Sequence, residues 1–248
     1  MTLKSWQKKI PNELRLRLIN RSLILLFICL TTILSAQNTG EKRWGTWHMY
    51  FGTNKVSEKL SIHTEGQVRY YEHAKNFNQL LLRTGLNYHI NPTAIATMGY
   101  GYIVTDGTFE EFPEETNSRE HRIFEQFILK NVVGTFNFEH RYRLEQRFLD
   151  FGNTSDTQHR ARYRLQVTLP LNKIFFLNFY DEIFLNLQNQ VFGQNRLYGA
   201  LGASITNNLS IQVGYLKNHF SNAKYDRLQV GVFYNPDLRQ LFDAQNTP

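Results

Sequence analysis

The sequence predicts an all-β protein, an antiparallel up-and-down transmembrane β-barrel of 10 or 12 strands. Three observations predict it. Hydrophobic and polar residues alternate with a period of two over long segments, short turns alternate with longer loops, and the N-terminus has the pattern of an export signal. The chain has 248 residues, of which 42% are hydrophobic and 14% aromatic, and this suits one folded domain.

Residues 1–36 are expected to be a cleaved signal peptide. Six basic side chains and Glu13 give this segment a net charge of +5, which leaves +2 of the chain's +7 for the rest. The apolar run Leu23–Leu34 is too short to span a bilayer, and Ala36 supplies a small residue at the expected cleavage point. An uncleaved membrane anchor is the alternative. Once the signal peptide is removed, residues 37–248 are expected to form the barrel in the outer membrane of a Gram-negative bacterium. Because most of the excess positive charge lies in the N-terminal segment, a nucleic-acid partner is not expected.

The alternating segments follow one another along the chain at short intervals. The turns Asn91-Pro92 and Asn207-Asn208 are tight, whereas the connection 107–118 is long and acidic. Short turns at one end and longer loops at the other are typical of outer-membrane barrels, and strands of soluble proteins are usually shorter. The expected strands are 59–72, 77–90, 93–105, 119–131, 134–150, 157–170, 174–187, 192–206, 208–219 and 223–234, with a weaker one at 44–51. Either the weak segment is an arm and the barrel has ten strands, or one strand is unrecognised and it has twelve.

The two faces of the segment Phe136–Asp150 (FNFEHRYRLEQRFLD) differ sharply. One face carries Glu and Arg, the other mostly aromatic and aliphatic residues, and Lys is nearly absent from the interiors of the expected strands. Arg pairs with carboxylates in a planar, two-bond geometry and tolerates partial burial, so this face suits a polar lumen of interlocked ion pairs. The residues expected to line the lumen are Glu65, Arg69, Arg83, Glu139, Arg141, Arg143, Glu145, Arg147, Arg160, Arg162, Arg164, Glu182 and Arg196.

The opposite faces carry aromatic residues toward the strand ends, as the interfacial girdles of membrane barrels do. Two places fit poorly. Asp181 falls on the apolar face, and in 119–131 the charged residues Arg122 and Glu125 fall on opposite faces, which a β-bulge would reconcile. The tyrosines expected to face outward are Tyr70, Tyr88, Tyr100, Tyr102, Tyr215 and Tyr234.

Other chemical signals in the sequence are weak. The single cysteine, Cys29, lies in the expected signal peptide, so thiol chemistry and disulfides are excluded for the mature chain. The histidines have no metal-binding spacing, and neither a metal nor a cofactor is expected. Gly99 and Gly101 share one strand face, which indicates either a bend or close packing in the lumen. An acidic loop is read as a solvated loop, with a divalent-cation site as the alternative; it carries Glu110, Glu111, Glu114 and Glu115.

A series of short motifs in a fixed order carries a resemblance to a known family. Together they resemble the uncharacterised outer-membrane barrel family known as domain of unknown function 2490, over almost all of the expected mature chain. That resemblance implies a fold and a location, but no catalytic or binding residue. The motifs are WGTW (Trp44–Trp47), EGQVRY (Glu65–Tyr70), RTGLNY (Arg83–Tyr88), GYGY (Gly99–Tyr102), REHRIFEQ (Arg119–Gln126), RYRLEQR (Arg141–Arg147), RARYRLQVTLPL (Arg160–Leu171), YDEIFLN (Tyr180–Asn186) and QNRLYGALG (Gln194–Gly202).

The expected function is that of a non-enzymatic outer-membrane barrel, either structural or a narrow, porin-like channel that passes anions because Arg exceeds Glu. One alternative is an outer-membrane lipid hydrolase, suggested by His140 and His121 near the apolar face but unsupported by any GxSxG motif. Another is a soluble periplasmic ligand carrier with its apolar face inward. The expected partners are outer-membrane lipid and a small solute or ion in the lumen, and no protein partner is assigned.

Overall fold

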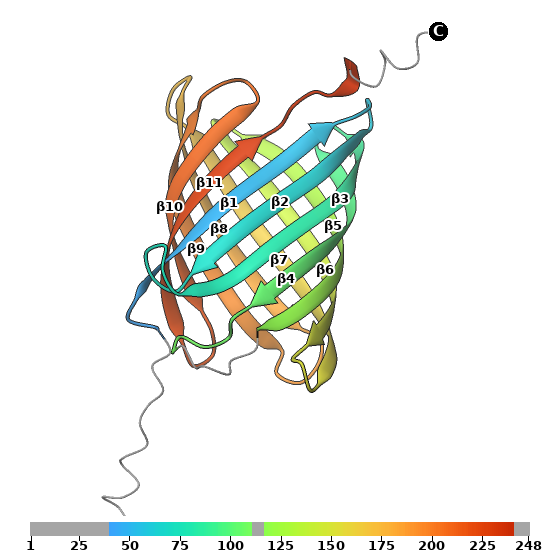
Figure 1. Cartoon of the computed structure of the whole chain (residues 1–248). Coiled ribbons are helices and arrows are strands. Elements are labelled where there is room, and N and C mark those ends of the chain that lie inside the picture. The colour runs from blue at the N-terminus through green and yellow to red at the C-terminus, as the bar shows by residue number, and fades with distance from the viewer. Residues whose placement is uncertain (1–39, 111–116, 241–248) are drawn as a thin grey trace, which may run out of the picture. The chain divides into compact units, whose positions relative to one another are not determined.

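The computed structural model describes residues 40–110 and 117–240, in which eleven β-strands close into a barrel (Figure 1). The expected signal peptide lies outside these residues. No helix among the described residues is long and apolar enough to cross a membrane. The strands are β1 (Trp44–Lys55), β2 (Leu60–Tyr70), β3 (Phe77–Asn91), β4 (Ala94–Thr105), β5 (Ser118–Val133), β6 (Phe136–Asp150), β7 (Ser155–Pro170), β8 (Phe175–Asn186), β9 (Phe192–Ser204), β10 (Leu209–His219) and β11 (Lys224–Tyr234).

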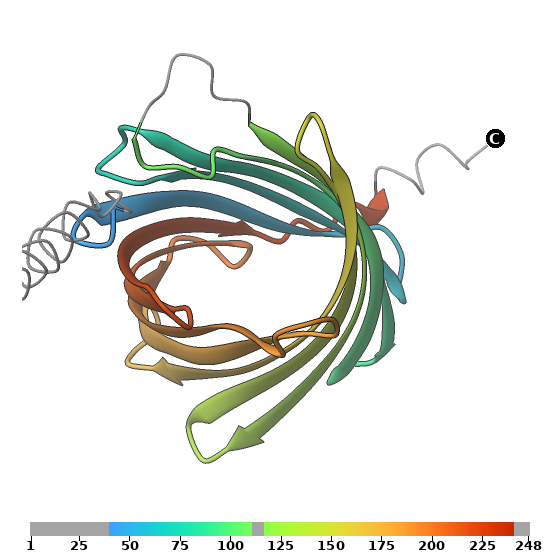
Figure 2. The same cartoon turned by 90° about the horizontal axis from the view of Figure 1, so that it is seen from below.

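Consecutive strands pair antiparallel, and the sheet closes where β1 pairs parallel with β11 (Figure 2). The weak segment 44–51 is therefore not an arm, and the barrel has neither ten nor twelve strands. The segment belongs to β1, which brings the number of described strands in the barrel to eleven. An odd number of alternating strands leaves the first and last pointing the same way, so the seam between them is parallel. Pairing on both sides gives the backbone of β1 hydrogen-bond partners and leaves the sheet without an open edge.

The strands bury their polar faces and expose their apolar faces. In β6, Arg143 and Glu145 are covered, with Glu145 only 1% exposed, whereas the intervening Leu144 is 50% exposed. The same alternation continues across the sheet, so the inside of the barrel is charged and the outside is hydrophobic.

The strand β5 is regular, and its two faces need no β-bulge to reconcile them. Its register with β4 and with β6 runs without a shift, so alternate residues point to opposite faces throughout. Arg122 and Phe124 point inward, while Glu125 is exposed on the outer face, where Gln146 donates a hydrogen bond to its carboxylate. Asp181 lies on the outer face too and accepts a hydrogen bond of 2.6 Å from Asn195. The alternation of polar and apolar residues is unclear in these two strands because Glu125 and Asp181 place carboxylates on the otherwise apolar outer face.

The two ends of the barrel differ in their connections. Longer loops, such as 71–76 and the loop after β4, lie at the end where β1 begins. Short turns lie at the other end, where β11 finishes. The segment after β11 stays on the barrel: Leu238 donates a backbone hydrogen bond to Lys55. Beside it, hydrogen bonds from Arg239 lower the pKa of Asp237 to about 2.

Candidate ligand-binding lumen

The structure places the thirteen expected lumen residues on the inner face of the barrel, where two cavities lie. The larger cavity, of about 500 Å³, is lined from the short-turn end by residues such as Thr53 and His89. The smaller, of about 390 Å³, reaches toward the long-loop end and is lined by residues such as Tyr71 and Phe220. The strands supply these side chains because every second residue of a barrel strand points inward.

Glu145 on β6 is the centre of the ion-pair network. Its carboxylate lies 2.6 Å from Arg160 and 2.7 Å from Arg162 on the neighbouring β7, and 3.5 Å from Arg122 and 3.7 Å from Arg143. Arg160 is its direct cross-strand partner and Arg162 is a diagonal neighbour, so the β6–β7 register creates both contacts. One carboxylate thus compensates several buried guanidinium groups.

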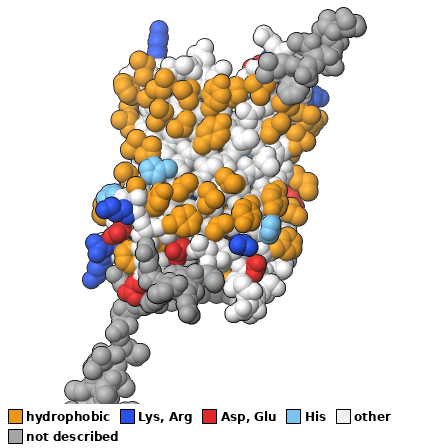
Figure 3. All heavy atoms as spheres, in the orientation of Figure 1, with side chains coloured by type: hydrophobic (Ala, Val, Ile, Leu, Met, Phe, Trp, Pro, Cys, Tyr) orange, Lys and Arg blue, Asp and Glu red, His pale blue; other side chains and the backbone are white. Residues whose placement is uncertain are grey.

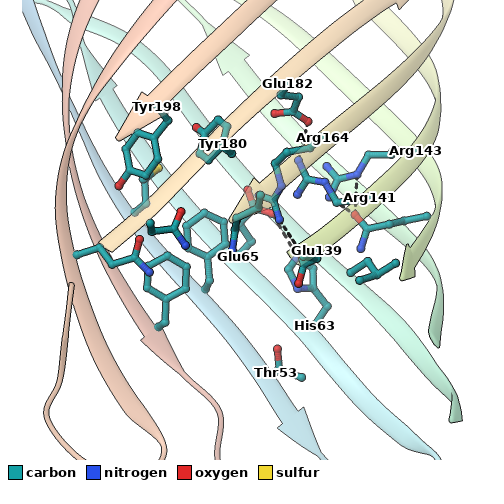
Figure 4. A pocket seen from close by; sticks show the side chains of 18 of the residues that line it. Thr53, His63, Glu65, Glu139, Arg141, Arg143, Arg164, Tyr180, Glu182 and Tyr198 are labelled. Atoms are coloured by element: carbon teal, nitrogen blue, oxygen red, sulfur yellow. Dashed lines mark hydrogen bonds and ion pairs between the residues drawn. The ribbon is translucent and has the colours of Figure 1, made fainter. Parts of the chain in front are cut away.

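Glu182 extends the network from β6 and β7 to the next strand, β8. Arg162 donates to it at 2.7 Å and Arg141 at 2.6 Å, so Arg162 joins two carboxylates. Figure 4 shows Arg141 and Glu139 from β6 and Glu182 from β8 reaching into the same cavity. Arg164 pairs with Glu139 at 2.6 Å. The interior is therefore held by charge-assisted hydrogen bonds that cross strand boundaries.

Sequence reasoning did not assign several inward residues. Glu120 and Arg122 on β5 are both buried, and Arg122 lies 2.5 Å from Glu120. The alternation of β5 could have located them if Glu125 had been accepted as an outward residue. Arg227 on β11 is buried as well and donates to the backbone carbonyl of Arg43. Trp47, the last residue of the WGTW motif, is an interior residue too, with the guanidinium of a neighbouring arginine 3.8 Å from its ring centre.

We call the wall that the two cavities share the waist. Its members line both cavities: Trp47, Arg69, Arg83, Arg162 and Arg196.

The waist is densely packed. Phe184, which is 1% exposed, has the guanidinium groups of Arg162 and Arg196 over its ring at 4.1 and 4.6 Å. Phe124 on β5 is fully covered as well, and Gly99 on the neighbouring β4 makes room for its ring. Arginines stacked on aromatic faces and tied to carboxylates thus fill the middle of the lumen.

The outer wall of the barrel is hydrophobic. Almost every strand contributes exposed large apolar side chains, for example Leu82 on β3, Leu144 on β6 and Val213 on β10. Figure 3 shows hydrophobic side chains over the upper and middle parts of the facing wall, with most charged side chains gathered toward the end of the longer loops. Of the tyrosines expected outside, Tyr88, Tyr100, Tyr215 and Tyr234 are exposed there.

Two histidines considered for hydrolysis lie on the outer wall beside tyrosines. His140 is hydrogen-bonded to Tyr163 at 2.9 Å, and His121 to Tyr100 at 2.5 Å. A Ser–His pair that sequence reasoning missed lies inside the barrel, where Ser61 and a β3 histidine are 2.8 Å apart. The Ser61 side chain is completely covered.

The acidic loop, the alternative divalent-cation site, lies mostly outside the described residues. Of its four glutamates only Glu110 is described, and the other three lie in the segment 111–116. Within the described parts of the chain, no group of three or more His, Cys, Asp or Glu side chains is placed to hold a metal ion.

Residues 44–229 match the family described as Protein of unknown function (DUF2490). The chain belongs to this family. The match begins at the first residue of β1 and ends within β11, so it includes all of β1 and the first part of β11. No curated protein and no solved structure matches the chain. The family is described as one of unknown function, so membership assigns no activity to the barrel.

Proposed function

We propose that this DUF2490 protein is a non-enzymatic outer-membrane barrel with a structural role, closed at its waist by ion pairs and aromatic rings. The observation that carries the proposal is the combination of a hydrophobic outer wall with a charged, packed interior. A soluble carrier would have the reverse arrangement, with its apolar faces around the ligand and its charges in water.

The outer wall supports a location in lipid. Monomeric soluble proteins rarely expose apolar patches of more than a few hundred Å², and here exposed apolar side chains surround the barrel. The strands have 11 to 16 residues, whereas about 9 to 11 residues cross a bilayer core when tilted. A closed sheet also satisfies its backbone groups internally, as hydrocarbon requires.

The interior supports a closed lumen. Glu145 and Phe184 are each 1% exposed at the level of the waist, and Arg162 bridges the carboxylates of Glu145 and Glu182. Barrels of about this strand number have interiors that side chains fill. The network therefore stiffens the barrel and blocks a continuous water path.

Extraction and gel mobility test the location. The barrel should remain in the membrane after osmotic shock and dissolve only in detergent. In cold SDS it should stay folded and migrate differently from the boiled sample. Release by osmotic shock, with no mobility change on boiling, would overturn the proposal and favour a soluble carrier.

Conductance separates a closed barrel from the second candidate, a narrow anion channel, which the excess of arginine in the lumen favours. In planar bilayers the wild type should show almost no current. Under the channel reading, Arg143→Ala and Arg162→Ala should change both the size and the anion preference of a clear current. Almost no current in the wild type and in both variants would exclude the channel.

The absence of enzymatic activity is part of the proposal and has its own test. Purified barrel incubated with phospholipid and with lipid A should release no fatty acid. Release that disappears in His140→Ala but persists in Tyr142→Ala, a matched change on the same strand face, would instead identify a lipid hydrolase.

A further inference from the structure

Arg196 on β9 differs from the other interior arginines in what its guanidinium contacts. Across residues 40–110 and 117–240, no hydrogen bond reaches this group, no carboxylate lies within 4.0 Å of it, and its buried Nε has no partner. By contrast, Arg162 pairs with two carboxylates, and Arg69 donates to the side-chain oxygens of Gln67 and Gln79. Arg196 therefore keeps donors available for another acceptor.

Aromatic rings hold Arg196 in place. Its guanidinium carbon lies 4.6 Å from the ring centre of Phe184 and 5.0 Å from that of Trp47. Stacking on ring faces orients a guanidinium but leaves its in-plane N–H groups unused. Arg196 lines both cavities, so an acceptor in either one can approach these N–H groups.

The surroundings of Arg196 are strongly cationic. The larger cavity is lined by eight Arg and Lys side chains against three Glu, and the smaller by eight Arg against one Glu. Buried charges need compensation, and the carboxylates of the barrel do not supply enough of it. The field at the waist therefore attracts anions and repels cations.

We propose that the waist binds a small oxyanion, a phosphate or a carboxylate, on the in-plane N–H groups of Arg196. The planar fork of a guanidinium matches two oxygens of such a group. The walls beside it include Tyr180 and Tyr198, stacked with ring centres 4.6 Å apart, so a small organic body attached to the oxyanion has an aromatic surface to pack on. This site goes beyond the structural role proposed above, because a closed barrel and a conducting one would both hold the anion.

Isothermal titration of the detergent-solubilised full chain tests the site. Inorganic phosphate and acetate are titrated separately, with chloride keeping the ionic strength constant. We expect saturable binding of at least one of them, weakened at least about tenfold in Arg196→Gln because charged hydrogen bonds are lost. Arg239→Gln, the same change in an arginine outside the barrel strands, should bind as the wild type does. Binding of phosphate alone identifies a phosphate site, and binding of acetate alone a carboxylate site.

Folding is checked by gel mobility before and after boiling. If Arg196→Gln does not fold, Arg196→Lys replaces it; that variant keeps the charge but loses the planar fork, and should bind several-fold more weakly than the wild type. The proposal is overturned if neither anion binds the wild type saturably. It is overturned equally if the folded Arg196 variant binds with unchanged affinity, since the anion would then be held elsewhere.

Discussion

Arg162 on β7 lies 2.7 Å from Glu145 on β6, and both side chains are almost completely covered inside the barrel. The pair is diagonal across two neighbouring strands, because Glu145 is directly opposite Arg160. Burying charges in this way costs desolvation energy, which contacts of this quality offset only while both partners are present. The interior therefore depends on the balance between its few carboxylates and its many arginines.

Glu145→Gln removes the central carboxylate while keeping the size of the side chain. It should lower the free energy of unfolding by about 3–5 kcal/mol, because four buried guanidinium groups lose a neighbouring anion. Urea titration of the barrel in lipid vesicles measures the change. The control is Glu58→Gln, whose exposed side chain pairs with Arg239 and should alter stability by no measurable amount. Equal stability of the wild type and Glu145→Gln would mean that the network contributes little.

Gly99→Ala should destabilise the barrel by about 1–3 kcal/mol through overpacking. A Cβ at this position would overlap the ring of Phe124 and lie 2.6 Å from the backbone oxygen of Thr84. Because one of these atoms belongs to the backbone, rotation of the ring alone does not relieve the contact. Gly66→Ala is the matched control, since its nearest heavy atom would be 3.8 Å away. The same urea titration compares the two, and a similar effect of both substitutions would contradict the packing argument.

Val213→Arg tests the proposal that the outer wall faces lipid. Val213 is 49% exposed on β10, between Leu201 and Val230 on the neighbouring strands. In water such a surface change would have little effect, but near the bilayer midplane it should cost about 2–4 kcal/mol. Val133→Arg, also on the outer face but at the end of β5 beside a short turn, should cost about 1 kcal/mol or less. Refolding titrations in vesicles measure both, and a harmless Val213→Arg would place this wall in water.

The parallel seam predicts a specific cross-link. His48 on β1 is the register partner of Val230 on β11. Cysteines at these two positions should form a disulfide under mild oxidation, because directly paired residues bring their Cα atoms within bonding range. The pair His48→Cys and Tyr234→Cys, four residues out of register, should stay reduced. Mass spectrometry of the tryptic peptides distinguishes these outcomes, and no cross-link in either pair would mean that β1 does not close the barrel.

Much of this architecture is visible in the sequence because alternation is a local property. The segment Phe136–Asp150 alone separates the inward Arg143 from the outward Leu144, and it does so without any knowledge of neighbouring strands. The same reasoning extends to the other strands with a clean period of two. It fails in β5, where the outward Glu125 conceals the inward Glu120 and Arg122.

The remaining features depend on contacts between distant segments. The role of β1 follows from closure of the whole sheet, which sets residue 44 beside residue 226. The missing partner of Arg196 follows from where several other strands place their carboxylates. The covered Ser61 beside His89 likewise results from the β2–β3 register. No local pattern carries this information.

Spin labels on two adjacent residues of β10 test the central claim, that the charged face lies inside and the apolar face lies in lipid. Gln212 lines the larger cavity and Val213 is exposed on the outer wall. Single cysteines can be introduced readily, because the chain's one cysteine is Cys29. In vesicles, the label at Val213 should be reached by oxygen and shielded from a water-soluble nickel reagent, with the opposite ratio at Gln212. A label at Val213 that meets the nickel reagent more readily than oxygen would show that the hydrophobic wall is not in a membrane.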